Sequence, residues 1–211
     1  GRVVITSFLG AVVAPSLLSV SGNYTNTNGV FVGGTGTATF NGTSAQIATG
    51  TMTGSSAFAN LDIKNSSATT TFGASASTTG NFYAVTPNSR IAFKSAATST
   101  FQNLIVAGGS GSEVYLHSAT PGTQWRVSVP GVRSVSFANV KDSHACTSAG
   151  NISASDSTDG GNNTCWTITA PSGVPTLASE ANQTFAVGQS TIAVSPMTIT
   201  DDATTPSITA A

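Results

Sequence analysis

The densest group of side chains able to do chemistry is the tetrapeptide Lys-Asp-Ser-His at residues 141–144. Glu113, His117 and Arg126 precede it, and a repetitive fold could bring them onto neighbouring turns of the chain. The aspartate and the histidine of the tetrapeptide are two residues apart, so in a strand they would share one face. This group is the candidate for a hydrolytic or lyase site, and a solvated surface or a capping network is the interpretation we favour.

The small number of carboxylates argues against an enzyme. Polysaccharide hydrolases need two carboxyl groups about 5 to 10 Å apart, and lyases need a base beside a clamp for a charged substrate. The chain has only eight acidic residues, and two of them, Asp201 and Asp202, lie near its C-terminus. We therefore expect no catalytic residues, and a polysaccharide lyase or hydrolase is the third alternative for function.

Two further motifs could hold a metal ion. Residues 156–162, Asp-Ser-Thr-Asp-Gly-Gly-Asn, supply oxygen ligands in a glycine-containing turn, which suits calcium, but their spacing does not match an EF-hand loop. We interpret this segment as an Asx/Gly turn. His117 and His144 have no metal-ligand spacing. We expect no metal and no cofactor.

Five aromatic residues could form an outward platform that binds glycans: Tyr24, Tyr83, Tyr115, Trp125 and Trp166. Core packing is the interpretation we favour for them, and Trp166 directly follows a cysteine, so we expect it to pack over a disulfide. A glycan-binding, adhesin-type module is therefore the second alternative for function.

Composition narrows the classes of partner. Charged residues make up 7% of the 211 residues and the net charge is −1. Arg2 is the only charged residue before Asp62, so no basic stripe is available to neutralise phosphates and we expect no nucleic-acid partner. An almost uncharged Ser/Thr/Asn surface has little self-repulsion, which favours association.

The two cysteines, Cys146 and Cys165, bracket a loop rich in Ser, Gly and Asn. A disulfide between them would close about 20 residues and stabilise the fold by about 3 kcal/mol. Two free thiols are the alternative, but the absence of metal-type spacing favours an oxidising compartment. We therefore expect a secreted protein, located outside the cell or on its surface.

The elements that must position these residues are strands and turns. Apolar residues alternate in short runs punctuated by Gly, Asn and Thr, and no window shows a helical stripe. The apolar stretch 3–20 predicts two strands joined at 14–16, with a signal or pilin-like anchor as the alternative, and we expect no membrane insertion.

Imperfect repeats in the sequence favour a solenoid among the all-β folds. The phrase at 21–24, Ser-Gly-Asn-Tyr, returns at 79–82 as Thr-Gly-Asn-Phe, and a Phe-x-Asn-Leu phrase recurs with loose spacing. A solenoid explains such reuse, because equivalent positions of successive coils stack on one another. We predict internal ladders of apolar residues and a ladder of asparagines at a bend. The predicted ladder positions are Phe58, Asn60, Leu61, Phe101, Asn103, Leu104, Phe137, Asn139 and Val140.

The segments 21–26, 36–43 and 58–63 resemble the repeats of very large secreted bacterial surface proteins, which are right-handed, adhesin-like β-helices. The resemblance covers roughly residues 8–166. It implies architecture and location, not a catalytic activity.

The repeats end near Trp166. We predict a β-solenoid over residues 1–169 with a disulfide-closed terminal loop, followed at 170–211 by a linker and an extended strand tail, which resembles the opening strands of an Ig-like module. We expect the tail to dock against its own solenoid or into a neighbouring subunit. The predicted assembly strands contain Val3, Val4, Ile5, Phe8, Leu9, Phe185, Val187, Ile192, Val194, Met197 and Ile199.

Taken together, the sequence predicts an all-β chain, a right-handed parallel β-helix of six or seven coils with an extended C-terminal β tail. We expect an extracellular structural protein, a spacer or subunit of a surface fibre that assembles by coil stacking and strand addition. The expected partners are other copies of the chain or neighbouring domains of a larger surface protein.

Overall fold

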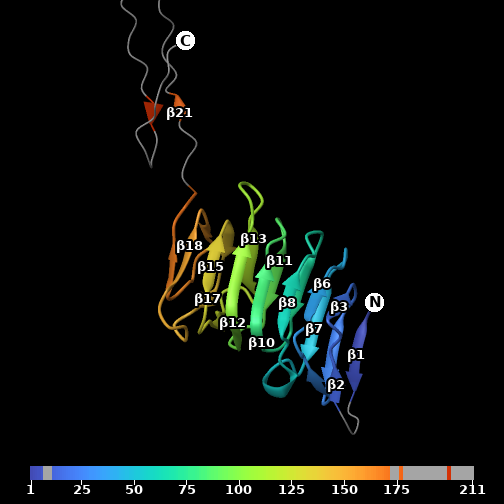
Figure 1. The fold of residues 1–211 in the computed structure, drawn as a ribbon. Helices are drawn as coiled ribbons and strands as arrows, with labels where there is room; N and C mark the ends of the chain where they lie inside the picture. The colour runs from blue at the N-terminus through green and yellow to red at the C-terminus, as the bar shows by residue number, and fades with distance from the viewer. Residues whose placement is uncertain (7–10, 172–175, 178–198, 201–211) are drawn as a thin grey trace, which may run out of the picture. The chain divides into compact units, whose positions relative to one another are not determined.

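The computed structural model describes residues 1–6, 11–171, 176–177 and 199–200 (Figure 1). Parallel strands stack in about seven coils, which confirms the predicted all-β solenoid. The described residues contain one helix, the three-residue 3-10 helix η1 (Gly54–Ser56), and no helix among them is long and apolar enough to cross a membrane. The chain divides into two units, residues 1–171 and 172–211, whereas the sequence places the boundary after residue 169.

The first sheet forms one side of the solenoid and contains eight parallel strands that follow one another along its axis (Figure 1). In spatial order these are β1 (Val3–Thr6), β4 (Tyr24–Thr27), β7 (Gln46–Gly50), β9 (Thr69–Phe72), β11 (Arg90–Phe93), β13 (Val114–Ser118), β16 (Ala138–Val140) and β19 (Thr158–Asp159).

The second sheet contains ten strands, also parallel. Its main path is β3 (Leu17–Val20), β6 (Thr37–Phe40), β8 (Asn60–Ile63), β10 (Ser77–Ala84), β12 (Thr98–Ala107), β15 (Arg133–Ser136), β18 (Ile152–Ser155) and β20 (Trp166–Ile168). Beside that path, β14 (Trp125–Ser128) pairs with β12 and with β17 (Ser143–His144). The long strand β12 therefore pairs with two strands of the next coil, β14 and β15.

Two small sheets complete the description. β2 (Ala11–Val13) pairs in parallel with β5 (Val30–Val32) and forms a third face of the first two coils. In the C-terminal unit, β21 (Thr176–Leu177) pairs with β22 (Ile199–Thr200) in antiparallel orientation.

The alternation of side chains explains why these segments form strands around a core. In β13, Val114, Leu116 and Ser118 are buried while Tyr115 and His117 between them are half-exposed. Successive side chains of a strand point to opposite faces, so one set fills the interior and the other forms the surface. Each fully buried large apolar side chain stabilises the fold by about 1.5–3 kcal/mol.

Aromatic rings form a continuous stack inside the middle coils. Phe72 and Phe93 stack with their ring centroids 5.6 Å apart, and Phe93 stacks on Trp125 at 4.1 Å. Phe82 and Phe101 lie 4.4 Å apart in the same core. These rings come from neighbouring coils, so the stack ties each coil to the next.

The asparagine ladder joins three successive coils of the second sheet. The Asn60 Oδ1 atom accepts a hydrogen bond from the Asn81 backbone N–H at 2.9 Å, and Asn103 Nδ2 donates to Asn81 Oδ1 at 2.9 Å. The ladder ends on backbone groups at both sides: Asn60 Nδ2 donates to the Gly36 carbonyl, and Asn103 Oδ1 accepts from the Val132 N–H at 2.8 Å. Asn60 and Asn103 are thus two coils apart, with Asn81 between them.

Glycines give the ladder room. A Cβ atom on Gly80 would lie 2.6 Å from Asn60 Oδ1, and one on Gly131 would lie 2.4 Å from Asn103 Oδ1. Only glycine permits this close approach of one coil to the amide side chain of the coil before it.

The third predicted repeat does not belong to this ladder. Asn139 and Val140 lie in β16 of the first sheet, where they pair with Tyr115 and Leu116, and Phe137 is half-buried at the corner before it. The predicted equivalence of residues 21–24 and 79–82 is also wrong, since Tyr24 begins a strand of the first sheet and Phe82 lies in the second. A Gly-Asn corner can precede a strand on either sheet, so the phrase alone does not identify the face.

The other predicted apolar ladder positions lie in the core of the second sheet. Phe58 and Phe101 both pair with Thr78, one from each side, and both are fully buried. Leu61 and Leu104 likewise flank Phe82.

The predicted assembly strands are only partly described. Val3, Val4 and Ile5 form β1, and the stretch 3–20 contains three strands where the sequence predicts two. Ile199 pairs with Leu177 in the C-terminal unit. The other members lie outside the described residues: Phe8, Leu9, Phe185, Val187, Ile192, Val194 and Met197.

Candidate binding surface

The outer face of the first sheet gathers polar and aromatic side chains in its C-terminal half. Arg90, Tyr115, Asn139 and Thr158 are register partners on the adjacent strands β11, β13, β16 and β19. Parallel strands in register place such side chains in a row along the solenoid axis. The row therefore combines a cation, an aromatic ring, an amide and a hydroxyl on one flat surface.

Contacts between these side chains fix their orientation. The Arg90 guanidinium carbon lies 4.1 Å from the centre of the Tyr115 ring, a cation–π contact. The ring of His117 meets that of Tyr115 edge-on with centroids 5.5 Å apart, and His117 Nε2 forms a 2.8 Å hydrogen bond with Asn139 Oδ1. Because neighbouring coils hold each group, the surface is ordered before any ligand binds.

A pocket of about 270 Å³ opens at the end of this row. Its polar lining includes two carboxylates, Glu113 and Asp156, which come from different coils. Glu113 Oε1 accepts a hydrogen bond from Thr158 Oγ1 at 2.7 Å, which fixes this carboxylate in position. The remaining walls are Ser110, Gly111, Tyr115, Phe137 and Pro171.

Two tight corners shape the pocket. Phe137 and Asp156 occupy the same position in successive coils, because each directly follows one of the paired residues Ser136 and Ser155. Both corner residues adopt a left-handed backbone conformation, with φ of 48° and 49°. This conformation is uncommon for residues other than glycine, so the packing of the coils must hold it.

The structure does not bring together the candidate cluster at 141–144, for which the sequence favours a solvated surface or a capping network over a reactive site. Asp142 is buried at a corner with φ of 52°, and His144 lies in β17 of the second sheet, so the two do not share a strand face. His144 is a register partner of Arg126, whereas His117 and Glu113 lie by the first sheet. The left-handed corner at Asp142 turns the chain from one sheet to the other and separates them.

Asp142 instead holds two loops together. Its Oδ2 atom accepts from the Gly122 N–H at 3.0 Å, and its Oδ1 atom accepts from Asn162 Nδ2 at 2.8 Å. Burial raises the pKa of Asp142, but these two hydrogen bonds, with the positive charges of Lys141 and His117, outweigh it and leave the pKa below its usual value. Asp142 is therefore a buried carboxylate with a structural role.

The two carboxylates of the candidate calcium segment at 156–162 have different surroundings. Asp159 Oδ1 accepts hydrogen bonds from the Gly161 N–H at 2.9 Å and from Asn163 Nδ2 at 2.6 Å, and Asp156 points into the pocket described above. Within residues 1–6 and 11–171, no group of three His, Cys, Asp or Glu side chains could hold a metal.

The five aromatic residues do not form one platform. Tyr24 and Trp125 are fully buried, and burial raises the pKa of the Tyr24 hydroxyl. Tyr83 and Tyr115 are half-exposed, but they lie in different sheets. Trp166 is half-buried against the core.

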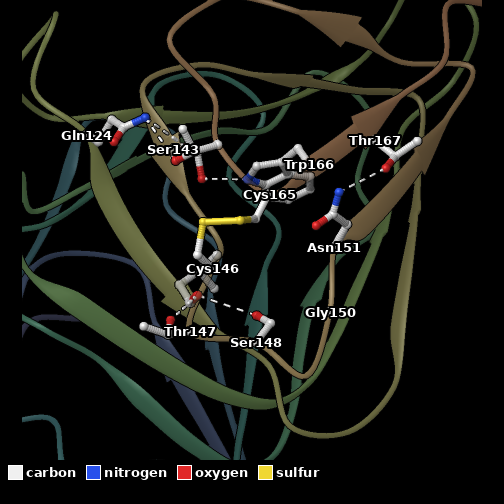
Figure 2. Close-up of a disulfide and its surroundings, with 12 residues drawn as sticks. Gln124, Ser143, Cys146, Thr147, Ser148, Gly150, Asn151, Cys165, Trp166 and Thr167 are labelled. Atoms are coloured by element: carbon white, nitrogen blue, oxygen red, sulfur yellow. Dashed lines mark hydrogen bonds between the residues drawn. A yellow bond between two sulfur atoms is a disulfide. The ribbon is translucent and has the colours of Figure 1, made fainter.

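The disulfide closes the C-terminal loop of the solenoid as the sequence predicts. Cys146 and Cys165 are joined with their Cα atoms 5.0 Å apart. Figure 2 shows Trp166 beside the bridge, and its Nε1 donates to Ser143 Oγ at 2.9 Å. On the other side of the loop, Thr147 Oγ1 donates to the Val127 carbonyl at 2.8 Å. The disulfide thus fixes a polar loop covalently to the last coils.

Sequence reasoning missed the pocket, although it noted Glu113 and Tyr115 separately. Their proximity to Asp156 follows from the register of three coils of unequal length. Compared with protein-family models, with curated proteins and with solved structures, the chain matches none of them.

Proposed function

We propose that this chain is an extracellular structural protein, a rigid β-solenoid that serves as a spacer or subunit of a surface fibre and assembles through the edge of its first coil. The observation that carries the proposal is the difference between the two ends of the solenoid unit. The first coils present an apolar strand edge, and the last coils present a polar, disulfide-closed loop.

The edge strand β1 supports strand addition. The Val3 N–H donates to the Asn23 carbonyl at 2.9 Å, so this residue bonds toward β4. Alternate residues of a strand direct their backbone groups to opposite sides, so the Val4 N–H points away from β4. Within the described residues no strand pairs with β1 on that side. Such an edge is a template for another strand.

Exposed apolar side chains concentrate near the same end. Of the eight exposed large hydrophobic side chains in the described residues, six lie in the first three coils: Val4, Val13, Leu17, Val30, Val32 and Ile47. Val13 and Leu17 are 68% and 65% exposed. Val13 and Val32 are register partners on the third face. Burial of this surface would favour association, with almost no charge to oppose it.

The C-terminal end of the solenoid has the features of a cap. Thr158, Asp159 and Thr164 are exposed on the segment that the disulfide closes, and Thr167 is exposed in β20 directly after it. A polar end of this kind resists stacking on another copy. The chain would therefore associate through its first coil and not through its last, which is consistent with a spacer. The disulfide also suits an oxidising compartment.

Sedimentation velocity and negative-stain microscopy of the purified full chain test this proposal. We expect dimers that join through their first coils, whose proportion rises with protein concentration and persists in high salt, because apolar contacts and backbone pairing carry the association. A monodisperse monomer over the whole concentration range would refute the proposal.

A further inference from the structure

The pocket between Glu113 and Asp156 has no place in the structural role and is built from three separate coils. Its walls come from the loop 110–113, from the start of β13 and from the corner residues Phe137 and Asp156. At about 270 Å³ it lies just below the range of 300–1,000 Å³ found for sites of drug-sized ligands. It therefore fits one side chain or one small group.

The negative charge of the pocket favours a cationic ligand. Among the described residues, the one ion pair joins Lys64 to Asp62, so neither Glu113 nor Asp156 has a basic nitrogen within 4.0 Å. Both carboxylates line the same pocket. Of the four side chains in the row, Arg90 is the cation, and it lies over the Tyr115 ring. Two carboxylates without an ion-pair partner favour a cation and disfavour an acidic ligand.

The aromatic walls point to an organic cation. The Tyr115 ring already holds the Arg90 guanidinium on one face, and Phe137 and Pro171 add apolar wall. The faces of these rings offer no ligands to a metal ion, whereas they pack well against the methylene stem of an alkylammonium group.

The hydrogen bonding of Glu113 distinguishes between the two basic side chains. One of its oxygens, Oε1, already accepts from Thr158 Oγ1. That leaves one oxygen fully free, which suits the point charge of an ammonium group better than the planar fork of a guanidinium group. We propose that the pocket is a docking site for a lysine side chain of a protein partner.

An NMR titration of the protein with Nα-acetyl-lysine N-methylamide at low salt tests this assignment. We expect saturable shifts with a millimolar dissociation constant that weakens as salt is added. The norleucine derivative has the same stem without the charge, and we expect no binding. Equal binding of norleucine, or tighter binding of the arginine derivative, methyl glucosaminide or Ca²⁺, would overturn the assignment.

Substitutions of the lining residues test whether the lysine derivative binds in this pocket. Glu113→Gln and Asp156→Asn keep the shape of the side chain and remove its charge, and each should raise the dissociation constant about tenfold through loss of a charge-assisted hydrogen bond. Tyr115→Ala should weaken binding as well. The matched controls Asp62→Asn and Tyr83→Ala change the same residue types on the second sheet and should leave binding unchanged.

Unchanged thermal unfolding of the Glu113→Gln and Asp156→Asn variants shows that they fold, and two folded variants that bind lysine like the wild type would refute the site. The result is independent of the assembly proposal, because the pocket lies on coils remote in sequence from β1. A chain that stays monomeric can still bind lysine, and a chain that associates can fail to bind it.

Discussion

The side-chain amide of Asn103 donates a hydrogen bond to the side-chain oxygen of Asn81 at 2.9 Å, and these two residues lie at the same position of adjacent coils. Each asparagine thereby satisfies a polar group of its neighbour at a half-buried position of strands β10 and β12, just after a register shift between the two strands. This relationship makes the stacking of coils directional, since a slip of one residue would leave the amides unpaired.

The asparagine ladder should contribute measurably to stability. Asn81→Ala leaves Asn60 Oδ1 without one donor and Asn103 Nδ2 without its acceptor, so we expect a loss of about 1–3 kcal/mol in the free energy of unfolding. Urea unfolding followed by tryptophan fluorescence measures it, because both tryptophans lie in the solenoid unit.

Asn41→Ala is the matched control for this change. Asn41 also bonds to a side chain of the adjacent coil, Ser19, but the pair is exposed to water. We expect a loss within about 0.5 kcal/mol there. Equal losses in the two variants would show that the half-buried ladder has no special role.

Removal of the disulfide should destabilise the last coils. We expect Cys146→Ser combined with Cys165→Ser to lower the free energy of unfolding by about 3 kcal/mol, because the bridge restricts the unfolded chain. Reduction of the wild type should produce the same loss, and the double variant should not respond to reductant. A wild type that unfolds at the same urea concentration with and without reductant would contradict this prediction.

The buried carboxylate of Asp142 should make stability sensitive to acid. Its pKa is lower in the folded protein than in the unfolded chain, where it is about 3.9. The folded state therefore gains stability from the ionised form above that pH, and the gain is lost as the pH falls through the lowered value. Urea unfolding between pH 2 and 6 should show this loss in the wild type and a smaller one in Asp142→Asn.

Asn162→Ala tests the cause of that shift. This change removes the side-chain donor to Asp142 Oδ1. We expect the pKa of Asp142 to rise toward its usual value, which carboxyl ¹³C NMR measures directly. A pKa that stays in place would assign the shift to the Gly122 N–H and the neighbouring charges instead.

The aromatic stack should be the most sensitive part of the core. Phe93→Ala removes a ring that stacks on both Phe72 and Trp125, and we expect a cost of about 3–5 kcal/mol. Ile47→Ala, at a 46% exposed position, should change stability by less than about 0.5 kcal/mol. Similar costs at both positions in urea unfolding would contradict the packing described here.

The edge of β1 should control assembly. Val4→Pro removes the backbone N–H that points away from β4, so it should block strand addition and leave the ladder to β4 in place. Val4→Thr keeps that N–H and is the matched control. We expect sedimentation velocity to show mainly monomer for the proline variant and oligomers for the threonine variant, and oligomers in both would refute the role of this edge.

The sequence by itself determined the all-β solenoid and the disulfide. Period-2 alternation, a lack of helical stripes and the Phe-x-Asn-Leu phrases around Asn60 and Asn103 are local properties that depend on which residues follow one another. The two cysteines needed no further information, because they have only each other as partners.

Only the tertiary structure decided which coils meet. The corners absorb loops of different length, so spacing in the sequence does not give the register. Asn81 enters the ladder although the sequence groups its phrase, residues 79–82, with residues 21–24, and Asn139 falls on the other sheet. For the same reason Glu113 and Asp156, 43 residues apart in the printed sequence, line one pocket. Side chains on separate coils become neighbours through backbone pairing between coils, and that pairing exists only in the folded stack.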